Sequence, residues 1–223
     1  TYTFEASGGL LNASLVMQDK ETDSYWSIMK ETALSGPASG SRLDLLPGSE
    51  KTTWGTWMDK HPDTLILTYQ GREHVPYDPY ANYFSSRSGF NGIRASDTRL
   101  PDKTMVFTFR RDGIPYAIPH MSFSGGGIVK LPGGTHFLYR RKGDSVFQST
   151  TVIGIPIGAA VKLENEDWLL RTGDRNYTFD PGTRSFRGAE ETLGTALEGF
   201  DTFWYVWSLT NDSTELLSAE KLR

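Results

Sequence analysis

The 223-residue chain contains no cysteine, which excludes disulfide bonds, thiolate zinc sites, iron–sulfur clusters and a cysteine nucleophile. Long apolar runs are missing as well. The longest run, Thr151–Val161, contains glycine and proline and falls well short of the roughly 20 residues that a membrane-spanning helix needs. We therefore expect no transmembrane segment in this chain, and we interpret the run as a buried strand interrupted at Pro156.

An excess of basic charge is also absent. The chain has 23 Lys and Arg against 27 Asp and Glu, which gives a formal net charge of −4. Proteins that bind nucleic acid normally present a basic face to the phosphates, so the sequence predicts no nucleic-acid partner. Only four histidines are present, and no two of them have the spacing of metal ligands on a helix. We expect neither a metal site nor another cofactor.

Turn-forming and aromatic residues are plentiful, with 23 glycines, 11 prolines and an aromatic content of 13%. This composition favours many short strands joined by tight turns. Met105–Phe109 has the pattern of a strand, Arg110–Gly113 ends in the Asp-Gly pair typical of hairpin turns, and Tyr116–Ile118 is expected to pair back. A second hairpin is predicted between Phe137–Tyr139 and Ser145–Phe147. We therefore predict a mainly β fold, a β-rich α+β protein in which helix is minor.

The two ends of the chain resemble each other. Trp54-x-x-Trp57 is followed by Thr64, and Trp204-x-x-Trp207 is followed by Thr214 at the same spacing. Upstream of each lies a second match, in which Asp, Thr and Ser recur in the pattern D-x-x-T-x-S, beginning at Asp19 and again at Asp180. Matches in the same order with a single change in spacing indicate an internal duplication.

We predict one compact domain over residues 1–223, made of two repeated units of β-hairpin and short helix. The first unit covers residues 1–69, the second covers 167–223, and a β-meander over 70–166 joins them. Within each unit, the D-x-x-T-x-S pattern predicts a polar turn between two strands.

The Trp-x-x-Trp pattern predicts a short helix in each unit. Thr52 or Thr53 stands where an N-cap is expected in the first unit, and Asp201 does so in the second. Pro62 is expected to stop the first helix, and Thr64–Thr68 has the pattern of the strand that follows it. We expect the tryptophans to pack in the core: Trp26, Trp54, Trp57, Trp204 and Trp207.

Catalytic motifs are scarce. Glu73 and His74 with Asp78 could form an acid/base group, because paired titratable side chains do such work when their environments separate their pKa values. The same residues are equally consistent with a solvated loop, so we regard them only as weak catalytic candidates. Aromatic side chains with arginine are typical of protein interfaces. On that ground the candidate interface residues are Tyr77, Tyr80, Tyr83, Phe84 and Arg87.

The sequence resembles a bacterial and archaeal family, domain of unknown function family 3179, over nearly its whole length. The resemblance is carried by an F-x-x-S-G turn at 4–8, V-M-x-D at 16–19, T-x-S-x-W at 22–26, G-P-x-x-G at 36–40 and W-x-x-W ahead of H-P-D-T at 54–64. Family members usually carry a C-P-L-C-type motif just before the first of these. This chain begins after that point and has no cysteine, which favours a structural role over a catalytic one.

Three functions remain open. The first is a non-catalytic accessory or structural protein that binds protein partners, as a peripheral subunit of a membrane-bound complex such as an electron-transfer or photosynthetic assembly. Because members of the family are commonly predicted to be exported, the resemblance implies a periplasmic or extracellular location for such a subunit. The second function is a hydrolase or carbohydrate-active enzyme that uses carboxylates. The third is a small-ligand-binding module with an aromatic-lined cleft between the repeats.

Overall fold

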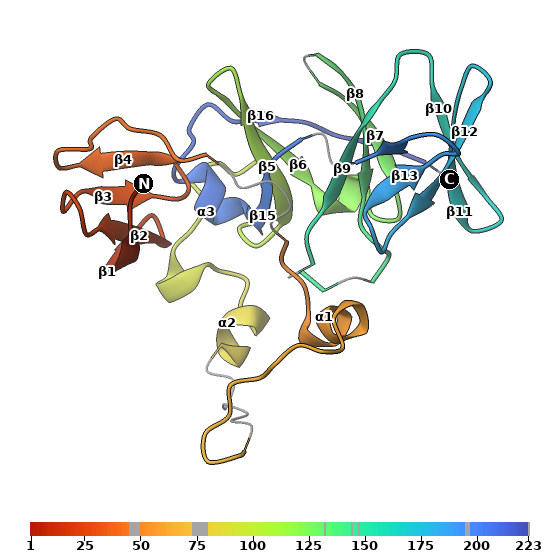
Figure 1. The fold of residues 1–223 in the computed structure, drawn as a ribbon. Coiled ribbons are helices and arrows are strands. Elements are labelled where there is room, and N and C mark those ends of the chain that lie inside the picture. The colour runs from red at the N-terminus through yellow and green to blue at the C-terminus, as the bar shows by residue number, and fades with distance from the viewer. Residues whose placement is uncertain are drawn as a thin grey trace.

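The computed structural model describes residues 1–44, 50–72, 80–131, 133–143, 145–146, 148–194 and 197–222. It confirms the predicted β-rich fold. A central group of strands lies between an N-terminal meander and a C-terminal meander, and the segment that carries α1 and α2 projects from this body (Figure 1). In the described part of the chain, no helix has both the length and the apolar character needed to cross a membrane.

The N-terminal meander is a four-stranded antiparallel sheet whose strands follow one another in chain order. They are β1 (Phe4–Leu11), β2 (Ser14–Asp19), β3 (Tyr25–Ser27) and β4 (Thr32–Ser35). The predicted polar turn joins β2 to β3. Asp19 accepts hydrogen bonds there from the backbone N–H of Thr22 at 2.6 Å and from the indole Nε1 of Trp26 at 2.7 Å. The turn residue and the buried tryptophan are therefore fixed by the same carboxylate.

The C-terminal meander repeats this arrangement with five strands in chain order. They are β10 (Ala160–Glu164), β11 (Asp167–Thr172), β12 (Arg175–Asp180), β13 (Ser185–Arg187) and β14 (Thr192–Leu193). The second D-x-x-T-x-S pattern forms the turn between β12 and β13, where Asp180 accepts the backbone N–H of Gly182 at 2.8 Å. Both copies of the pattern therefore build the same kind of hairpin turn.

The central strands form two four-stranded sheets. In the first, the order is β15 (Phe200–Phe203), β5 (Met105–Arg111), β6 (Ile114–Pro119) and β16 (Glu215–Leu216). In the second, it is β17 (Glu220–Lys221), β7 (Gly127–Leu131), β8 (Gly134–Tyr139) and β9 (Thr151–Ile155). The predicted hairpin of β5 and β6 is confirmed, and its turn residues Asp112 and Gly113 both have positive φ, as a two-residue hairpin turn requires.

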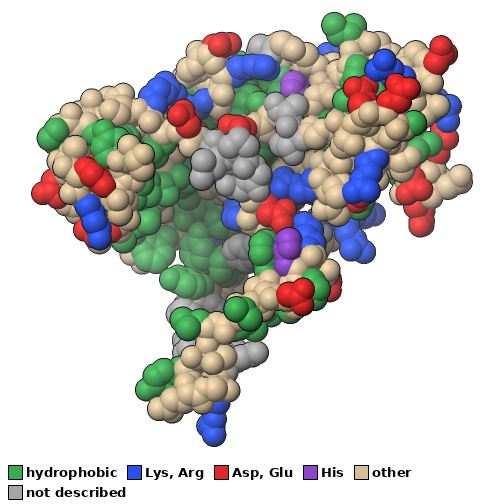
Figure 2. All heavy atoms as spheres, in the orientation of Figure 1, with side chains coloured by type: hydrophobic (Ala, Val, Ile, Leu, Met, Phe, Trp, Pro, Cys, Tyr) green, Lys and Arg blue, Asp and Glu red, His purple; other side chains and the backbone are tan. Residues whose placement is uncertain are grey.

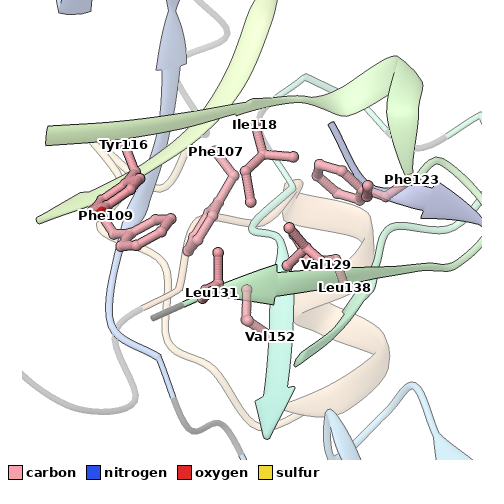
Figure 3. Close-up of a cluster of buried hydrophobic side chains, with 10 residues drawn as sticks. Phe107, Phe109, Tyr116, Ile118, Phe123, Val129, Leu131, Leu138 and Val152 are labelled. Carbon is pink, nitrogen blue, oxygen red and sulfur yellow. The ribbon is translucent and has the colours of Figure 1, made fainter. Parts of the chain in front are cut away.

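The main core lies between these two sheets. Apolar side chains of β5 and β6 point toward those of β7, β8 and β9, and Phe123 closes one end of the cluster (Figure 3). Phe109 and Tyr116 stack with their ring centroids 4.9 Å apart. A second cluster, which includes Phe137 and Trp168, connects β8 and β9 to the C-terminal meander. The central strands are thus buried from both sides.

Five short helices complete the described elements: α1 (Trp54–Lys60), α2 (Ala81–Ser85), η1 (Phe90–Gly92), η2 (His120–Ser122) and α3 (Trp204–Ser208). Thr53 caps α1 as predicted, since its side chain accepts the backbone N–H of Thr56. The N-cap of α3 is Phe203, so the prediction of Asp201 as a cap is wrong. Asp201 lies in β15, where its carboxylate bonds to other segments.

The two helical units share local hydrogen bonds. His61 N–H donates to the carbonyl of Trp57 at 2.8 Å, and Asn211 N–H donates to that of Trp207 at 3.0 Å. The hydroxyls of Thr64 and Thr214 then donate to the carbonyls of His61 and Asn211 at 2.8 and 2.7 Å. This common geometry supports the internal duplication, whose boundaries stay a prediction.

Each meander contacts the helical unit of the other copy. In the N-terminal meander, the Asn12 side chain donates to the carbonyl of Leu209 at 2.8 Å. In the C-terminal meander, the guanidinium of Arg184 lies 3.4 Å from the carboxylate of Glu50, just before α1. The copies are therefore interlaced around the central sheets and do not form two separate halves.

Three predictions about elements are wrong. Trp54 is 53% exposed and Trp57 is half-buried, and neither belongs to a core cluster of the described residues, because α1 buries none of its side chains. Thr64–Thr68 is assigned no strand, and it has no strand partner among the described residues. The strand that pairs with β8 begins at Thr151, opposite Tyr139, and not at Ser145, whose carbonyl instead accepts a hydrogen bond from the Arg140 guanidinium at 2.8 Å. Phe147 lies outside the described residues.

Candidate functional site

Four of the sequence candidates lie outside the described residues: Glu73, His74, Tyr77 and Asp78. The acid/base group and part of the interface are therefore not placed. Asp63, the acidic residue that precedes them in the sequence, is exposed in the turn after α1.

The segment around α1 exposes an apolar strip, which we define as Trp54, Leu65, Ile66, Leu67, Tyr69 and Tyr80. Leu65 and Leu67 are 95% and 97% exposed, and Tyr69 is 76% exposed. The strip leads into a two-residue turn at Gln70 and Gly71, both with positive φ. Tyr69 and Arg72 exchange both backbone hydrogen bonds across that turn, each at 3.1 Å. Figure 2 shows hydrophobic side chains on this projection.

In the second copy, the corresponding helix is covered by other parts of the chain. All five residues of α3 are buried, and Trp204 and Trp207 pack against Val106 of β5 and Ala117 of β6. The residues after α3 form β16, which pairs in parallel with β6. No described element of the chain covers α1 in this way, and Trp54, Leu65 and Leu67 of its unit stay exposed to solvent.

A second feature is a cleft of about 850 Å³ between α2, the start of β5 and the end of β15. Its lining includes Phe84, Arg87, Lys103, Met105, Val146 and Phe203. Phe84 and Arg87 are two of the predicted interface residues, and Tyr83 lies beside them on α2. In Figure 2, hydrophobic side chains gather in a hollow between the N-terminal meander and the projection.

Aromatic rings surround a lysine at one wall of this cleft. The Lys103 Nζ lies 3.7 Å from the ring centroid of Tyr83 and 5.8 Å from that of Phe203, and it donates to the backbone carbonyl of Tyr83. Desolvation lowers the pKa of Lys103. The hydroxyl oxygens of Tyr83 and Tyr205 lie 3.0 Å apart, and burial together with this hydrogen bond raises the pKa of Tyr83.

A third feature is a buried polar network around Asp201. Its carboxylate accepts the backbone N–H of Thr150 at 2.8 Å and the hydroxyl of the same residue. His120 Nε2 lies 2.6 Å from Oδ1 of Asp201, and a guanidinium nitrogen of Arg140 lies 3.7 Å from it. Lys51 donates from Nζ to the backbone carbonyl of Asp201 at 2.6 Å.

Burial and hydrogen bonding oppose each other in this network. Burial raises the pKa of Asp201, but the hydrogen bonds from His120 and Thr150 together outweigh it, so the pKa lies below its ordinary value. Burial lowers the pKa of His120, although the hydrogen bond with Asp201 acts in the opposite direction. Every polar atom of the carboxylate is engaged within the fold, so the network joins β15, η2 and the start of β9.

The network was missed in the sequence because its members lie far apart along the chain. The sequence predicts Asp201 as a helix cap, and His120 has no neighbour in the sequence that marks it as a partner of Asp201. The only local signal was that both follow or lie within strongly apolar segments, where a polar side chain needs a partner. Among the described residues, no three His, Asp or Glu side chains lie close enough together to hold a metal ion.

The comparisons with known proteins agree with the resemblance in the sequence. The model of one family, described as a protein of unknown function (DUF3179), matches residues 1–214. No curated protein and no solved structure matches the chain. Because the match covers almost the entire chain, the protein belongs to the DUF3179 family.

Proposed function

We propose that the protein is a non-catalytic accessory protein that binds a protein partner through the apolar strip. The observation that carries the proposal is the exposure of Leu65 and Leu67 next to a helix with no buried residue. Apolar side chains that lie together in solvent mark interaction sites, because their burial on binding is favourable.

The buried polar network favours this binding role over an enzymatic one. A catalytic carboxylate or histidine needs free capacity to exchange protons with a substrate. Asp201 is instead surrounded by donors from Thr150 and His120, and its side chain is only 2% exposed. The network therefore has the character of a structural joint.

The location of the partner is a further part of the proposal. We place the protein on the periplasmic or extracellular face of a membrane, as a peripheral subunit of a membrane-bound complex. This part rests on the family resemblance.

The test compares three tagged chains expressed in the native cells: the wild type, Leu65→Ser with Leu67→Ser, and the control Ile157→Ser. Ile157 is fully exposed in the turn between β9 and β10, so it matches the exposure of the strip but lies outside it. Each chain is extracted from membranes in mild detergent and separated by size.

We expect the wild type and the control to elute in one assembly of larger size and to cross-link to the same partner. The double variant should elute alone, with an unchanged circular dichroism spectrum. A wild-type chain that elutes as a monomer from both the membrane and the soluble fraction would exclude the accessory role.

A further inference from the structure

The cleft beside α2 combines an apolar lining with cationic side chains. Phe84, Val146 and Phe203 come from segments far apart in the sequence and meet at this cleft with Met105 of β5. Its volume, about 850 Å³, lies within the roughly 300–1,000 Å³ of small-molecule sites. An apolar cleft of this size accepts a molecule with an apolar body.

The charge of the lining is one-sided. Lys103 and Arg87 are the charged residues among the described lining, and none of the described lining residues is acidic. Asp102, which precedes Lys103 in the chain, is engaged elsewhere: its carboxylate binds Arg94 Nε at 2.7 Å and the backbone N–H of Ala95 at 2.8 Å. The described part of the chain thus offers Lys103 no carboxylate partner, and its ammonium instead contacts aromatic rings and one carbonyl.

The Lys103 ammonium is held in a fixed place. It has three N–H donors, of which the carbonyl of Tyr83 occupies one. The rings of Tyr83 and Phe203 restrict its position by cation–π contact. A partly desolvated ammonium with donors to spare at the wall of an apolar cleft is suited to an anionic head group, because charge-assisted hydrogen bonds are stronger there than in water.

We propose that this cleft binds a free amphiphilic carboxylate, such as a medium-chain fatty acid, with its carboxylate at Lys103 and Arg87. The aliphatic chain lies against Phe84, Met105, Val146 and Phe203. This site goes beyond the proposed protein partner, because the cleft and the apolar strip share no residue.

The test uses a dansylated undecanoic acid as a fluorescent probe of the purified chain. Binding to the cleft moves the dansyl group out of water and increases its emission. Decanoate should displace the probe, whereas decanol, which has the same chain without the charge, should displace it at least about tenfold less well, on the scale of charge-assisted hydrogen bonds.

Four variants locate the site. Lys103→Met should weaken binding of the probe by about 10-fold to 100-fold, and Lys103→Arg should retain most of it. Arg87→Gln should also weaken binding of the probe. The Arg87 side chain is exposed and makes no hydrogen bond or ion pair with the described residues, so a loss of binding in this variant cannot be explained by misfolding. Lys162→Met removes an exposed lysine on β10, away from the cleft lining, and should leave binding unchanged.

Three outcomes would overturn the proposal. One is equal displacement of the probe by decanoate and decanol, which would mean that the charge of the ligand does not contribute to binding. Another is an unchanged affinity in both Lys103→Met and Arg87→Gln. The third is binding to phosphatidylglycerol vesicles without binding of decanoate, which would point to a bilayer surface as the ligand. None of these results affects the test of the apolar strip.

Discussion

At the scale of single residues, carboxylates decide how distant segments are joined. Asp19 holds its own turn and the indole of Trp26, which lies close in sequence, and this role is readable from the D-x-x-T-x-S pattern. Asp201 works over a long range: its donors Thr150 and His120 are 51 and 81 residues away. A local pattern cannot reveal such a partner, which explains why the sequence suggested a helix cap for Asp201.

Replacing the Asp201 carboxylate by an amide should destabilise the fold strongly. Asp201→Asn removes the charge that Arg140 and Lys51 face and sets an amide N–H₂ against donors of Thr150 and His120. Breaking one partner of a buried charged group costs about 3–5 kcal/mol. We expect a decrease of that size in the free energy of unfolding, measured by urea titration.

The matched control is Asp63→Asn in the exposed turn after α1, which should change the free energy of unfolding by less than about 0.5 kcal/mol. If the free energy of unfolding decreased as little in Asp201→Asn as in Asp63→Asn, the network would not stabilise the fold.

At the scale of elements, the same Trp-x-x-Trp helix has two different environments. The spacing of Trp54, Trp57 and the cap Thr53 correctly predicts a helix, because these are properties of the local backbone. It does not predict burial. α3 packs on the β5–β6 hairpin, whereas α1 has no described sheet against it. The prediction of a core position therefore fails for both tryptophans of α1, the exposed Trp54 and the half-buried Trp57.

This asymmetry gives a direct comparison. Trp207→Ala empties a fully buried site and should cost about 3–5 kcal/mol of unfolding free energy. Trp54→Ala removes a half-exposed ring and should cost less than about 1 kcal/mol in the isolated chain. Both values come from urea unfolding followed by circular dichroism. If Trp54→Ala destabilised the chain as much as Trp207→Ala, α1 would have to be packed in solution.

At the scale of the whole molecule, the polar network joins sheets that belong to different parts of the chain, so its protonation affects global stability. The pKa of His120 is lowered on folding from an ordinary value of 6.5. As the pH falls below that value, the unfolded chain binds the proton first, and stability decreases. The pKa of Asp201 is lowered from 3.8, so its contribution is lost at still lower pH, in the same direction.

We therefore expect the urea midpoint to decrease from pH 8 to pH 5. His120→Gln should have a lower midpoint at pH 8 and a shallower decrease. The decrease should not vanish, because burial lowers the pKa of His136 as well. His61→Gln, at the exposed end of α1, is the control and should keep the wild-type slope. A slope unchanged in His120→Gln would assign the pH dependence to other groups.

The sequence by itself determined the local structure: the β-rich class, the Asp-Gly hairpin of β5 and β6, the polar turns after Asp19 and Asp180, and the cap at Thr53. These depend on backbone preferences and on side chains within a few residues. Only the tertiary structure decided what each repeat packs against. The interlaced meanders, the Asp201 network, the cleft at Lys103 and the exposure of Leu65 and Leu67 all depend on contacts between residues far apart in the chain. The same pattern of residues is a core helix in one copy and an exposed strip in the other, because burial requires a partner surface that the pattern does not contain.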